Sequence, residues 1–319
     1  MAKKEAQAEK NRNFFCKGLF IFCSKKYNRN QENKKRYRGS FMETANEKRQ
    51  FETPEQMDAA AALFGDWPET ILWSVLQGKM GCMYVDDPER PASAAAVLGD
   101  FVFLAGEPSA ALIRFAAELE YPLDMCILLA QNAAWEQEIE EALVELGPEK
   151  LRKVTRYATH KSMADLQRPD VLERLQQMAD AVPRHFQIRE FDEEIFEIAR
   201  GEYWSRSQAV QFRDYEEFRE HGVGLAAFLG GIMAAGASTY SYYDGGIEVQ
   251  IDTDTGFREM GLAQCCGARL ILACLERGIY PSWDAHSAKS LALATKFGYE
   301  PAGEYTAYEF WQVECPVEE

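Results

Sequence analysis

A glycine-containing stretch before a predicted helix has the residue types that bind phosphate groups. It reads Arg258-Glu259-Met260-Gly261-Leu262-Ala263 and follows a strand predicted at residues 247–252. The first turn of a helix has backbone N–H groups without intrahelical partners, and its positive dipole end attracts anions. A glycine at this point lets the backbone approach a ligand closely. The segment therefore predicts a pyrophosphate site built from backbone amides.

A second glycine pattern, Gly222-Val223-Gly224-Leu225-Ala226-Ala227, fits a loose dinucleotide fingerprint. It precedes a predicted strand and hairpin, whereas the phosphate-binding mechanism needs a strand before it and a helix after it. We therefore do not expect this segment to bind a nucleotide. The His, Cys and carboxylate residues show no spacing typical of zinc sites, so no metal is predicted.

Strands and helices alternate around the phosphate-binding stretch. Strands are predicted at residues 186–191, 224–229, 233–242, 247–252, 279–283 and 299–310, and helices at 193–200, 215–221, 261–278 and 287–297. Ile247, Val249 and Ile251 alternate with polar residues, which is typical of a strand with one buried face. Gly230-Gly231 predicts a hairpin between antiparallel strands.

The preceding part of the chain has a similar order of elements. Helices are predicted within residues 54–78 and at 109–119, 135–146 and 168–181, and strands at 80–86, 92–98, 101–105, 124–130 and 152–161. This order predicts a parallel α/β core. Because residues 101–143 and 246–297 share it, the N-terminal part is either an unrelated α/β domain or a degenerate copy of the C-terminal one.

Charge is unevenly distributed along the 319 residues, whose net charge is −16. Residues 1–41 carry twelve Lys or Arg and three Glu, a balance of +9, and we expect a disordered tail or an upstream extension there. A basic arm for lipid or nucleic acid is the alternative. The acidic remainder disfavours nonspecific nucleic-acid binding, and the apolar run at 14–23 is too short to span a membrane. Eight cysteines without a Cys-x-x-Cys pair predict a reducing cytoplasm.

Two segments resemble a known enzyme family. The run Ile247-Glu248-Val249-Gln250-Ile251-Asp252-Thr253, followed by Arg258-x-x-Gly261-Leu262-Ala263, is similar to motif A of the GNAT (GCN5-related) N-acetyltransferases. Ser282-Trp283-Asp284, followed by Leu291-x-Leu293-Ala294-x-Lys296-Phe297-Gly298-Tyr299, is similar to their motif B and most similar to the zwittermicin-A-resistance type. The resemblance covers residues 185–312 well and 42–184 only by arrangement.

The resemblance implies an α/β (α+β) GNAT fold, in which a mixed central sheet is flanked by helices and preceded by a smaller α/β domain. It divides the chain into a tail at 1–41, an N-terminal domain at 42–184 and an acetyltransferase domain at 185–319. It also implies acetyl-CoA as the cofactor, with its pantetheine arm entering where two parallel strands separate. The strand residues implied to contact the pantetheine arm are Val249, Gln250 and Ile251. The residues implied to contact the pyrophosphate are Arg258, Glu259, Met260, Gly261, Leu262 and Ala263. Ser287 is a further implied cofactor contact.

Acetyl transfer to an amine needs a group that removes a proton and a donor for the charge on the carbonyl oxygen. Glu248 is the first candidate base because the family often has a glutamate there; a solvated strand carboxylate is the alternative, and Asp252 is a weaker candidate. Many members have a tyrosine as general acid where Ala294 stands, so the group that protonates the thiolate is not assigned. Trp283 and Asp284 are interpreted as structural, with Asp284 as a helix cap.

These features together predict a cytoplasmic N-acetyltransferase that modifies a primary amine of a small molecule by direct attack. No nucleic-acid or membrane partner is expected, and a homodimer is left open. Glu202, Tyr203 and Trp204 are candidates for the acceptor pocket, with loop packing as the alternative. A catalytically inactive GNAT-like protein, which binds acyl-CoA as a sensor or interaction module, is the alternative function. The sequence does not identify the acceptor amine.

Overall fold

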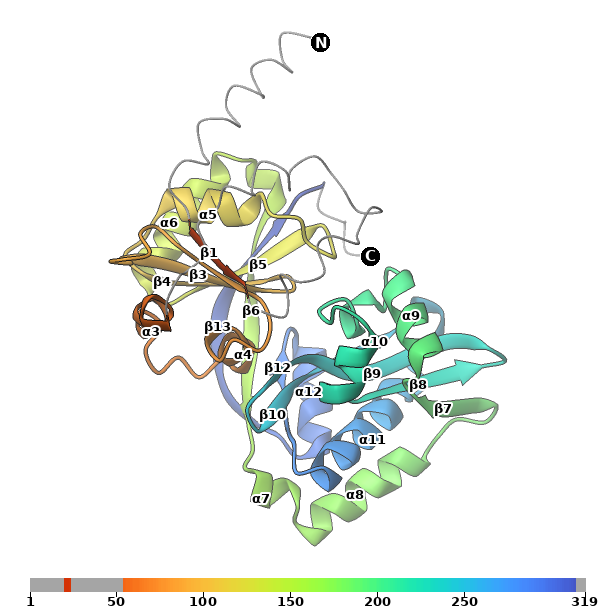
Figure 1. Ribbon diagram of the computed structural model, residues 1–319. Coiled ribbons are helices and arrows are strands. Elements are labelled where there is room, and N and C mark those ends of the chain that lie inside the picture. The colour runs from red at the N-terminus through yellow and green to blue at the C-terminus, as the bar shows by residue number, and fades with distance from the viewer. Residues whose placement is uncertain (1–19, 24–53, 314–319) are drawn as a thin grey trace, which may run out of the picture. The chain divides into compact units, whose positions relative to one another are not determined.

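The computed structural model describes residues 20–23 and 54–313 of the chain. The tail predicted at 1–41 therefore lies outside the described residues, apart from the short strand β1 (Phe20–Cys23). The chain forms two compact units (Figure 1). The first comprises the chain up to Lys153 together with the chain from Ala307, and the second comprises Val154–Thr306. Among the helices of residues 54–313, none is both long enough and apolar enough to cross a membrane.

The first unit contains a mixed sheet with the strand order β1-β2-β3-β4-β5-β13. Its further strands are β2 (Cys82–Val85), β3 (Ser93–Leu98), β4 (Phe101–Gly106), β5 (Met125–Ala130) and the part of β13 (Glu300–Trp311) from Ala307 onward. Its helices are α3 (Pro54–Ala62), α4 (Thr70–Leu76), α5 (Ala110–Ala117), α6 (Ala133–Val144) and the 3-10 turn η3 (Pro148–Lys150).

The predicted parallel core is wrong for most of this sheet. β4 and β5 are parallel. The pairs β1–β2, β2–β3 and β3–β4 are antiparallel, and so is the pair β5–β13. Parallel pairing needs a long crossover connection, and α5 supplies one between β4 and β5. The turns between β2, β3 and β4 are too short for a crossover, so these strands must be antiparallel.

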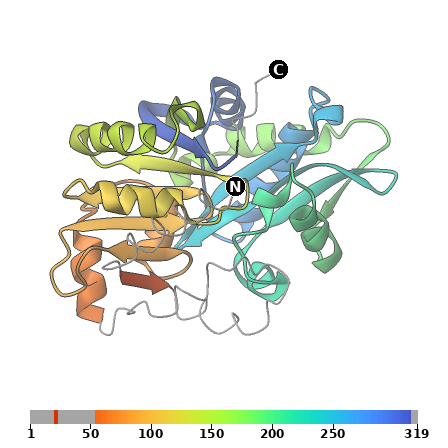
Figure 2. The same cartoon turned by 90° about the horizontal axis from the view of Figure 1, so that it is seen from above.

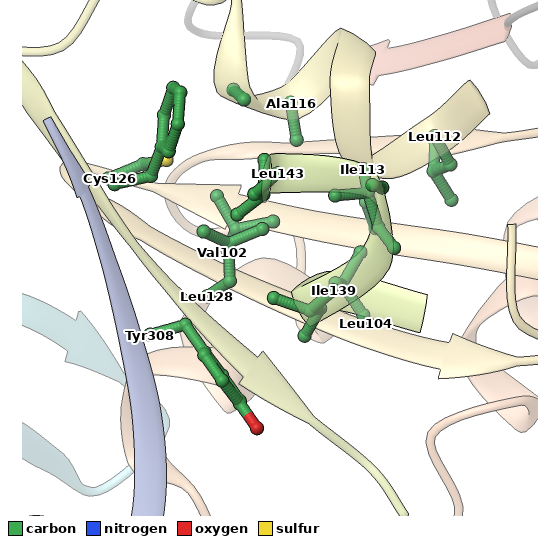
Figure 3. Packing of buried hydrophobic residues seen from close by; sticks show 14 of the residues in the cluster. Val102, Leu104, Leu112, Ile113, Ala116, Cys126, Leu128, Ile139, Leu143 and Tyr308 are labelled. Atoms are coloured by element: carbon green, nitrogen blue, oxygen red, sulfur yellow. The ribbon is translucent and has the colours of Figure 1, made fainter. Parts of the chain in front are cut away.

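The hydrophobic core of the first unit lies between one face of this sheet and the helices α5 and α6 (Figure 3). Val102 and Leu104 of β4 both point to this face, because side chains two residues apart lie on the same side of a strand. Ile113 of α5 and Ile139 of α6 belong to the same buried cluster. This packing places residues 101–143 in one β-α-β-α arrangement.

The second unit contains a sheet with the strand order β11-β10-β9-β8-β7. Its strands are β7 (Phe186–Glu190), β8 (Gly224–Leu229), β9 (Ile232–Tyr243), β10 (Gly246–Thr253) and β11 (Tyr280–Ser282). Its helices are α7 (Met163–Leu166), α8 (Pro169–Asp180), α9 (Glu193–Gly201), α10 (Tyr215–His221), α11 (Leu262–Glu276) and α12 (Ala288–Phe297), with 3-10 turns η4 (Arg206–Gln208) and η5 (Thr255–Phe257).

The strands β7 to β10 are antiparallel, and β8 and β9 form the predicted hairpin at Gly230-Gly231 (Figures 1 and 2). β10 and β11 are parallel, and α11 connects them. A separate short strand, β12 (Asp284–Ala285), pairs antiparallel with β6 (Leu151–His160). The predicted mixed α/β fold, with a sheet flanked by helices, is confirmed.

The division between the two units falls inside β6, whereas the sequence placed a boundary between residues 184 and 185. The helix α8 lies on the C-terminal side of this division because it packs along α11. Cys265 Sγ and Arg269 Nε of α11 donate hydrogen bonds to the carbonyl oxygens of Ala181 and Ala179, at 3.2 and 3.0 Å. Residues 163–184 are therefore part of the second unit.

Gly267 in the middle of α11 allows this helix to lie close to its neighbours. A Cβ atom at this position would be 2.7 Å from Cδ1 of Ile251 on β10 and 2.8 Å from Cζ of Phe297 on α12. Both distances are shorter than a normal carbon–carbon contact. A larger residue would therefore push α11 away from the strand that precedes it.

We expect Gly267→Ala to lower the free energy of unfolding by about 1–3 kcal/mol, because the clash outweighs the roughly 1 kcal/mol that alanine adds to helix propensity. Gly201 at the end of α9 is the control, since a Cβ there meets nothing within 4 Å. Gly201→Ala should leave stability unchanged or raise it. Urea denaturation measures both variants, and equal stability of the two would contradict the packing argument.

Candidate active site

The parallel strands β10 and β11 separate after a short ladder. β11 pairs with Gly246, Ile247 and Glu248 of β10, and the ladder ends at the pair Glu248 and Ser282. β10 continues to Thr253 beside β9, with a register shift between Glu248 and Val249 that marks a β-bulge. From Val249 onward, β11 no longer pairs with the edge of β10 that faces away from β9. This is the part of the strand that carries Val249, Gln250 and Ile251, the residues predicted to contact pantetheine.

Both faces of β10 are buried around Glu248. Ile247, Glu248 and Val249 are 1%, 4% and 8% exposed, so the alternation predicted from the sequence breaks at Glu248. The interpretation of Glu248 as a solvated strand carboxylate is therefore wrong.

Glu248 lies in a polar group of buried residues where the strands separate. Its Oε1 accepts a hydrogen bond from the backbone N–H of Asp284, with an N–O distance of 2.7 Å. The hydroxyl of Tyr243 on β9 is hydrogen-bonded to Oγ of Ser282. Burial raises the pKa of Tyr243 well above its usual value, and the nearby charge of Glu248 acts in the same direction. Tyr243 therefore remains protonated at neutral pH.

The predicted phosphate-binding stretch lies at the start of α11. Gly261 is the N-cap residue, with φ 80° and no side-chain cap, whereas α9 and α10 are capped by Asp192 and Asp214. A Cβ atom at Gly261 would meet nothing within 4 Å, and residues 258–261 are exposed. The backbone of the helix start is therefore accessible to an anion.

The loop before α11 has an unusual backbone at Glu259, whose φ of 65° lies in the left-handed region. Such a conformation costs about 1–3 kcal/mol for a residue other than glycine and is often found at ligand-binding loops. Asp254 supports the loop from its other end, since its Oδ1 accepts a hydrogen bond from the N–H of Gly256 at 2.8 Å. Arg258 is exposed and supplies the positive side chain of this loop.

The start of α12 differs from the prediction in one respect. Its N-cap is Ser287, whose Oγ accepts a hydrogen bond from the N–H of Ser290 at 3.3 Å. The predicted capping role of Asp284 is wrong, because its carboxylate forms a buried ion pair with Arg156 of β6. Ala294, at the position where many family members have a tyrosine, is fully buried. Ser287 thus has a structural role beside its predicted contact with the cofactor.

The predicted acceptor residues follow α9. Tyr203 is 55% exposed, and the guanidinium of Arg206 lies 5.0 Å from the centroid of its ring. Further along the same segment, Nε2 of Gln208 donates a hydrogen bond to Asp252 of β10 at 3.2 Å. Nε2 of Gln250 donates to the same carboxylate at 3.0 Å. Asp252 is therefore held by two amides, an arrangement that the sequence analysis missed because Gln208 belongs to no recognisable motif.

The cysteines of α11 are unsuited to carrying an acyl group. Burial raises the pKa of both Cys266 and Cys274 to about 12, and it also raises the pKa of Cys265. These thiols stay protonated at neutral pH, and the thiolate is the nucleophilic form. Within residues 20–23 and 54–313, no three His, Cys, Asp or Glu side chains form a group that could hold a metal ion.

The first unit contains the same order of elements, but its parallel strands do not separate. β4 and β5 pair up to Leu104 and Ala130, and the N–H of Gln131 continues the contact by donating to the carbonyl of Leu104. The side-chain Oε1 of Gln131 accepts from the N–H of Gly106 at 3.2 Å. The following helix α5 is capped by Ser109, whose side chain accepts from Leu112 N–H. The first unit thus lacks both features of the site at β10 and α11: its parallel strands stay in contact at their ends, and a side chain caps the start of its helix.

We expect Ser287→Ala to lower the free energy of unfolding by about 1 kcal/mol, because it removes the acceptor that caps α12. Ser287→Asn is the control, since asparagine caps helices equally well and should preserve stability. Thermal and urea unfolding of the two variants measure the difference. If Ser287→Ala unfolded like the unchanged protein, the capping role of Ser287 would be refuted.

Comparison with known proteins agrees with this arrangement. The GNAT acetyltransferase family model matches residues 61–308, and so includes parts of both units. The crystal structure of a GCN5-related N-acetyltransferase-like protein from Streptococcus suis 89/1591 is 44% identical, with a TM-score of 0.73, and the match covers 80% of this chain and 98% of that one.

An uncharacterized N-acetyltransferase of Bacillus subtilis (strain 168), YdfB, is 32% identical over 136 residues. That alignment covers 40% of this chain and about half, 49%, of the relative. The family match spans well over half of the chain and contains both motifs predicted from the sequence. The chain therefore belongs to the GNAT acetyltransferase family.

Proposed function

We propose that this protein transfers an acetyl group from acetyl-CoA to a primary amine of a small molecule. The observation that carries the proposal is the separation of β10 from β11 at Glu248 and Ser282. The strand edge beyond this point leads through one short loop to the exposed start of α11. A backbone edge and a helix N-terminus in this order suit an extended amide arm that ends in a pyrophosphate.

The residues present fit acetyl-CoA at this position. Backbone groups of Val249 and Ile251 hold the pantetheine arm, and Gln250 lies between them on the strand. Backbone amides from Arg258 to Ala263 hold the pyrophosphate, because Gly261 leaves the start of α11 open. The equivalent features of the first unit are closed by Gln131 and Ser109, so we expect one cofactor site in each chain.

Acetyl-CoA supplies the acetyl group as an activated thioester. Glu248 takes the proton that the attacking amine loses, directly or through a water molecule. Its burial at 4% exposure supports this role, since a carboxylate shielded from solvent interacts more strongly with a nearby proton donor. The pKa values raised by burial for Cys266 and Cys274 support direct attack rather than transfer through a cysteine.

The acceptor is a small cationic amine in this proposal. The net charge of −16 favours the approach of cations through the field of the whole protein. The exposed ring of Tyr203 lies on the segment predicted to line the acceptor site, and Gln208 further along that segment donates a hydrogen bond to the carboxylate of Asp252. A cytoplasmic location and the zwittermicin-A-resistance type remain predictions from the sequence, and a homodimer stays open.

Gly261→Ala tests the cofactor site. Gly278, at the other end of α11, is a matched control, because both glycines have positive φ and a Cβ at either meets nothing within 4 Å. Both alanine variants should therefore lose a similar stability, about 1–2 kcal/mol. Gly261→Ala should in addition weaken acetyl-CoA binding about tenfold or more, because a side chain at the helix start obstructs the phosphates.

Isothermal titration calorimetry measures both affinities and should give one site per chain. Equal acetyl-CoA affinity for Gly261→Ala and Gly278→Ala would overturn the placement of the pyrophosphate. Two sites per chain would contradict the closed state of the first unit.

Glu248→Gln tests the catalytic base. The glutamine oxygen can still accept the N–H of Asp284, so this variant keeps the hydrogen bond and removes the ability to take a proton. We expect kcat to fall by about 100-fold or more, while acetyl-CoA affinity is preserved. Glu276→Gln, at an exposed position in the last turn of α11, is the control and should keep the full rate.

A thiol-release assay with a panel of amines measures these rates. A Glu248→Gln variant with the unchanged rate would restrict Glu248 to holding the Asp284 amide. Acetyl-CoA binding without thiol release for any amine would instead favour the alternative function, a non-catalytic acyl-CoA sensor.

A further inference from the structure

The amide that holds Glu248 belongs to a residue whose own side chain is buried and fully engaged. The carboxylate of Asp284 is 10% exposed and forms an ion pair with Arg156 of β6, whose side chain is 7% exposed. Arg156 Nε lies 2.8 Å from Asp284 Oδ1, and the hydroxyl of Tyr305 on β13 donates to Asp284 Oδ2 at 2.6 Å. Burial lowers the pKa of Arg156, but Asp284 and Tyr305 outweigh this effect and keep its pKa above the usual value.

The segment around Asp284 is fixed by further contacts. β12 pairs with β6, matching Asp284 to Ala158. Thr159 Oγ1 of β6 donates a hydrogen bond to the carbonyl of Trp283. Trp283 is buried, and its Nε1 donates to Ser290 Oγ of α12 at 3.2 Å. The chain thus turns sharply from β11 to β12 and is held on the β6 side by side chains as well as by backbone pairing.

We propose that Asp284, anchored by Arg156 and Tyr305, is a positioning residue for Glu248. The inference rests on the proposed function, in which Glu248 is the base. The side chain of Asp284 fixes the turn, and the turn aims the Asp284 N–H at Glu248 Oε1. The carboxylate is thereby held in one orientation at the point where β10 and β11 separate. None of the three positioning side chains touches the reacting atoms in this proposal.

The energetics of a buried ion pair favour a positioning role over a contribution to stability alone. A buried ion pair gains little or nothing in net stability over well-packed apolar residues, because both charges lose their hydration. Such a pair fixes geometry, however, since an arginine and a carboxylate make directional hydrogen bonds. A displacement of about 1 Å in a catalytic group lowers rates up to 100-fold. The network therefore stands where precise orientation has a measurable effect.

Tyr305→Phe is the main test because it removes one hydrogen bond and keeps the ring. Tyr308→Phe is a matched control on the same strand, since the hydroxyl of Tyr308 also donates to a carboxylate, Glu140, at 2.8 Å. We expect Tyr305→Phe to lower kcat about 3- to 10-fold with unchanged acetyl-CoA affinity, and Tyr308→Phe to keep the full rate. Asp284→Asn should lower kcat further, about 10- to 100-fold. The rates are expressed per acetyl-CoA site counted by calorimetry, so that unfolded protein does not enter.

A double-mutant cycle with Glu248→Gln separates positioning from a general structural effect. If the network acts through Glu248, Tyr305→Phe should not reduce the residual rate of the Glu248→Gln variant any further. An equal fold loss in both backgrounds would overturn the positioning role while leaving the proposed function intact. A normal rate for Glu248→Gln alone would remove the catalytic base itself, and with it the proposal. Asp284→Asn leaves the Arg156 cation without its buried partner, so Tyr305→Phe decides the question if that variant does not fold.

Discussion

Backbone N–H groups that lose their partners where β11 leaves β10 set the constraint on which the second unit depends. A buried N–H needs an acceptor, and within a continuous sheet the neighbouring strand supplies it. The chain leaves β10 after Ser282 and joins β6 at Asp284, and there the acceptor is the carboxylate of Glu248. The separation of β11 from β10 and the burial of the Glu248 carboxylate are therefore linked by the same hydrogen bond. The ion pair between Asp284 and Arg156 holds β12 against β6.

The two units show that the order of elements alone does not create such a site. Both contain two parallel strands joined by a helix. In the first unit Gln131 extends the contact between the strands, and Ser109 occupies the start of the helix. In the second unit the strands part after Glu248, and the helix starts at an uncapped glycine. In the proposed function, cofactor binding thus depends on a few local hydrogen bonds rather than on topology.

The position of α11 relative to β10 links the two halves of the candidate site. Gly267 allows the helix to lie against Ile251, and the loop between Thr253 and Gly261 connects the strand to the helix. α11 also packs against α8, through hydrogen bonds from Arg269 and Cys265. Helix, strand and loop are thereby fixed together, so that a ligand bound along the strand edge meets the helix start at a constant distance.

Most of the elements, the family and the exposed glycine at the start of α11 could be predicted from the sequence. Local patterns sufficed for these: apolar periodicity marked β10 and α11, and the glycine at the start of α11 needs no distant partner to be recognised. The burial of Glu248, its hydrogen bond to Asp284 and the pairing of Asp284 with Arg156 were decided only by the tertiary structure. Arg156 and Asp284 are 128 positions apart, and Glu248 and Asp284 are 36 positions apart. The start of the second unit was also decided only by the tertiary structure. α8 belongs to this unit because it contacts α11 through hydrogen bonds between residues more than 80 positions apart. Such long-range contacts depend on how the elements pack, which a local pattern does not encode.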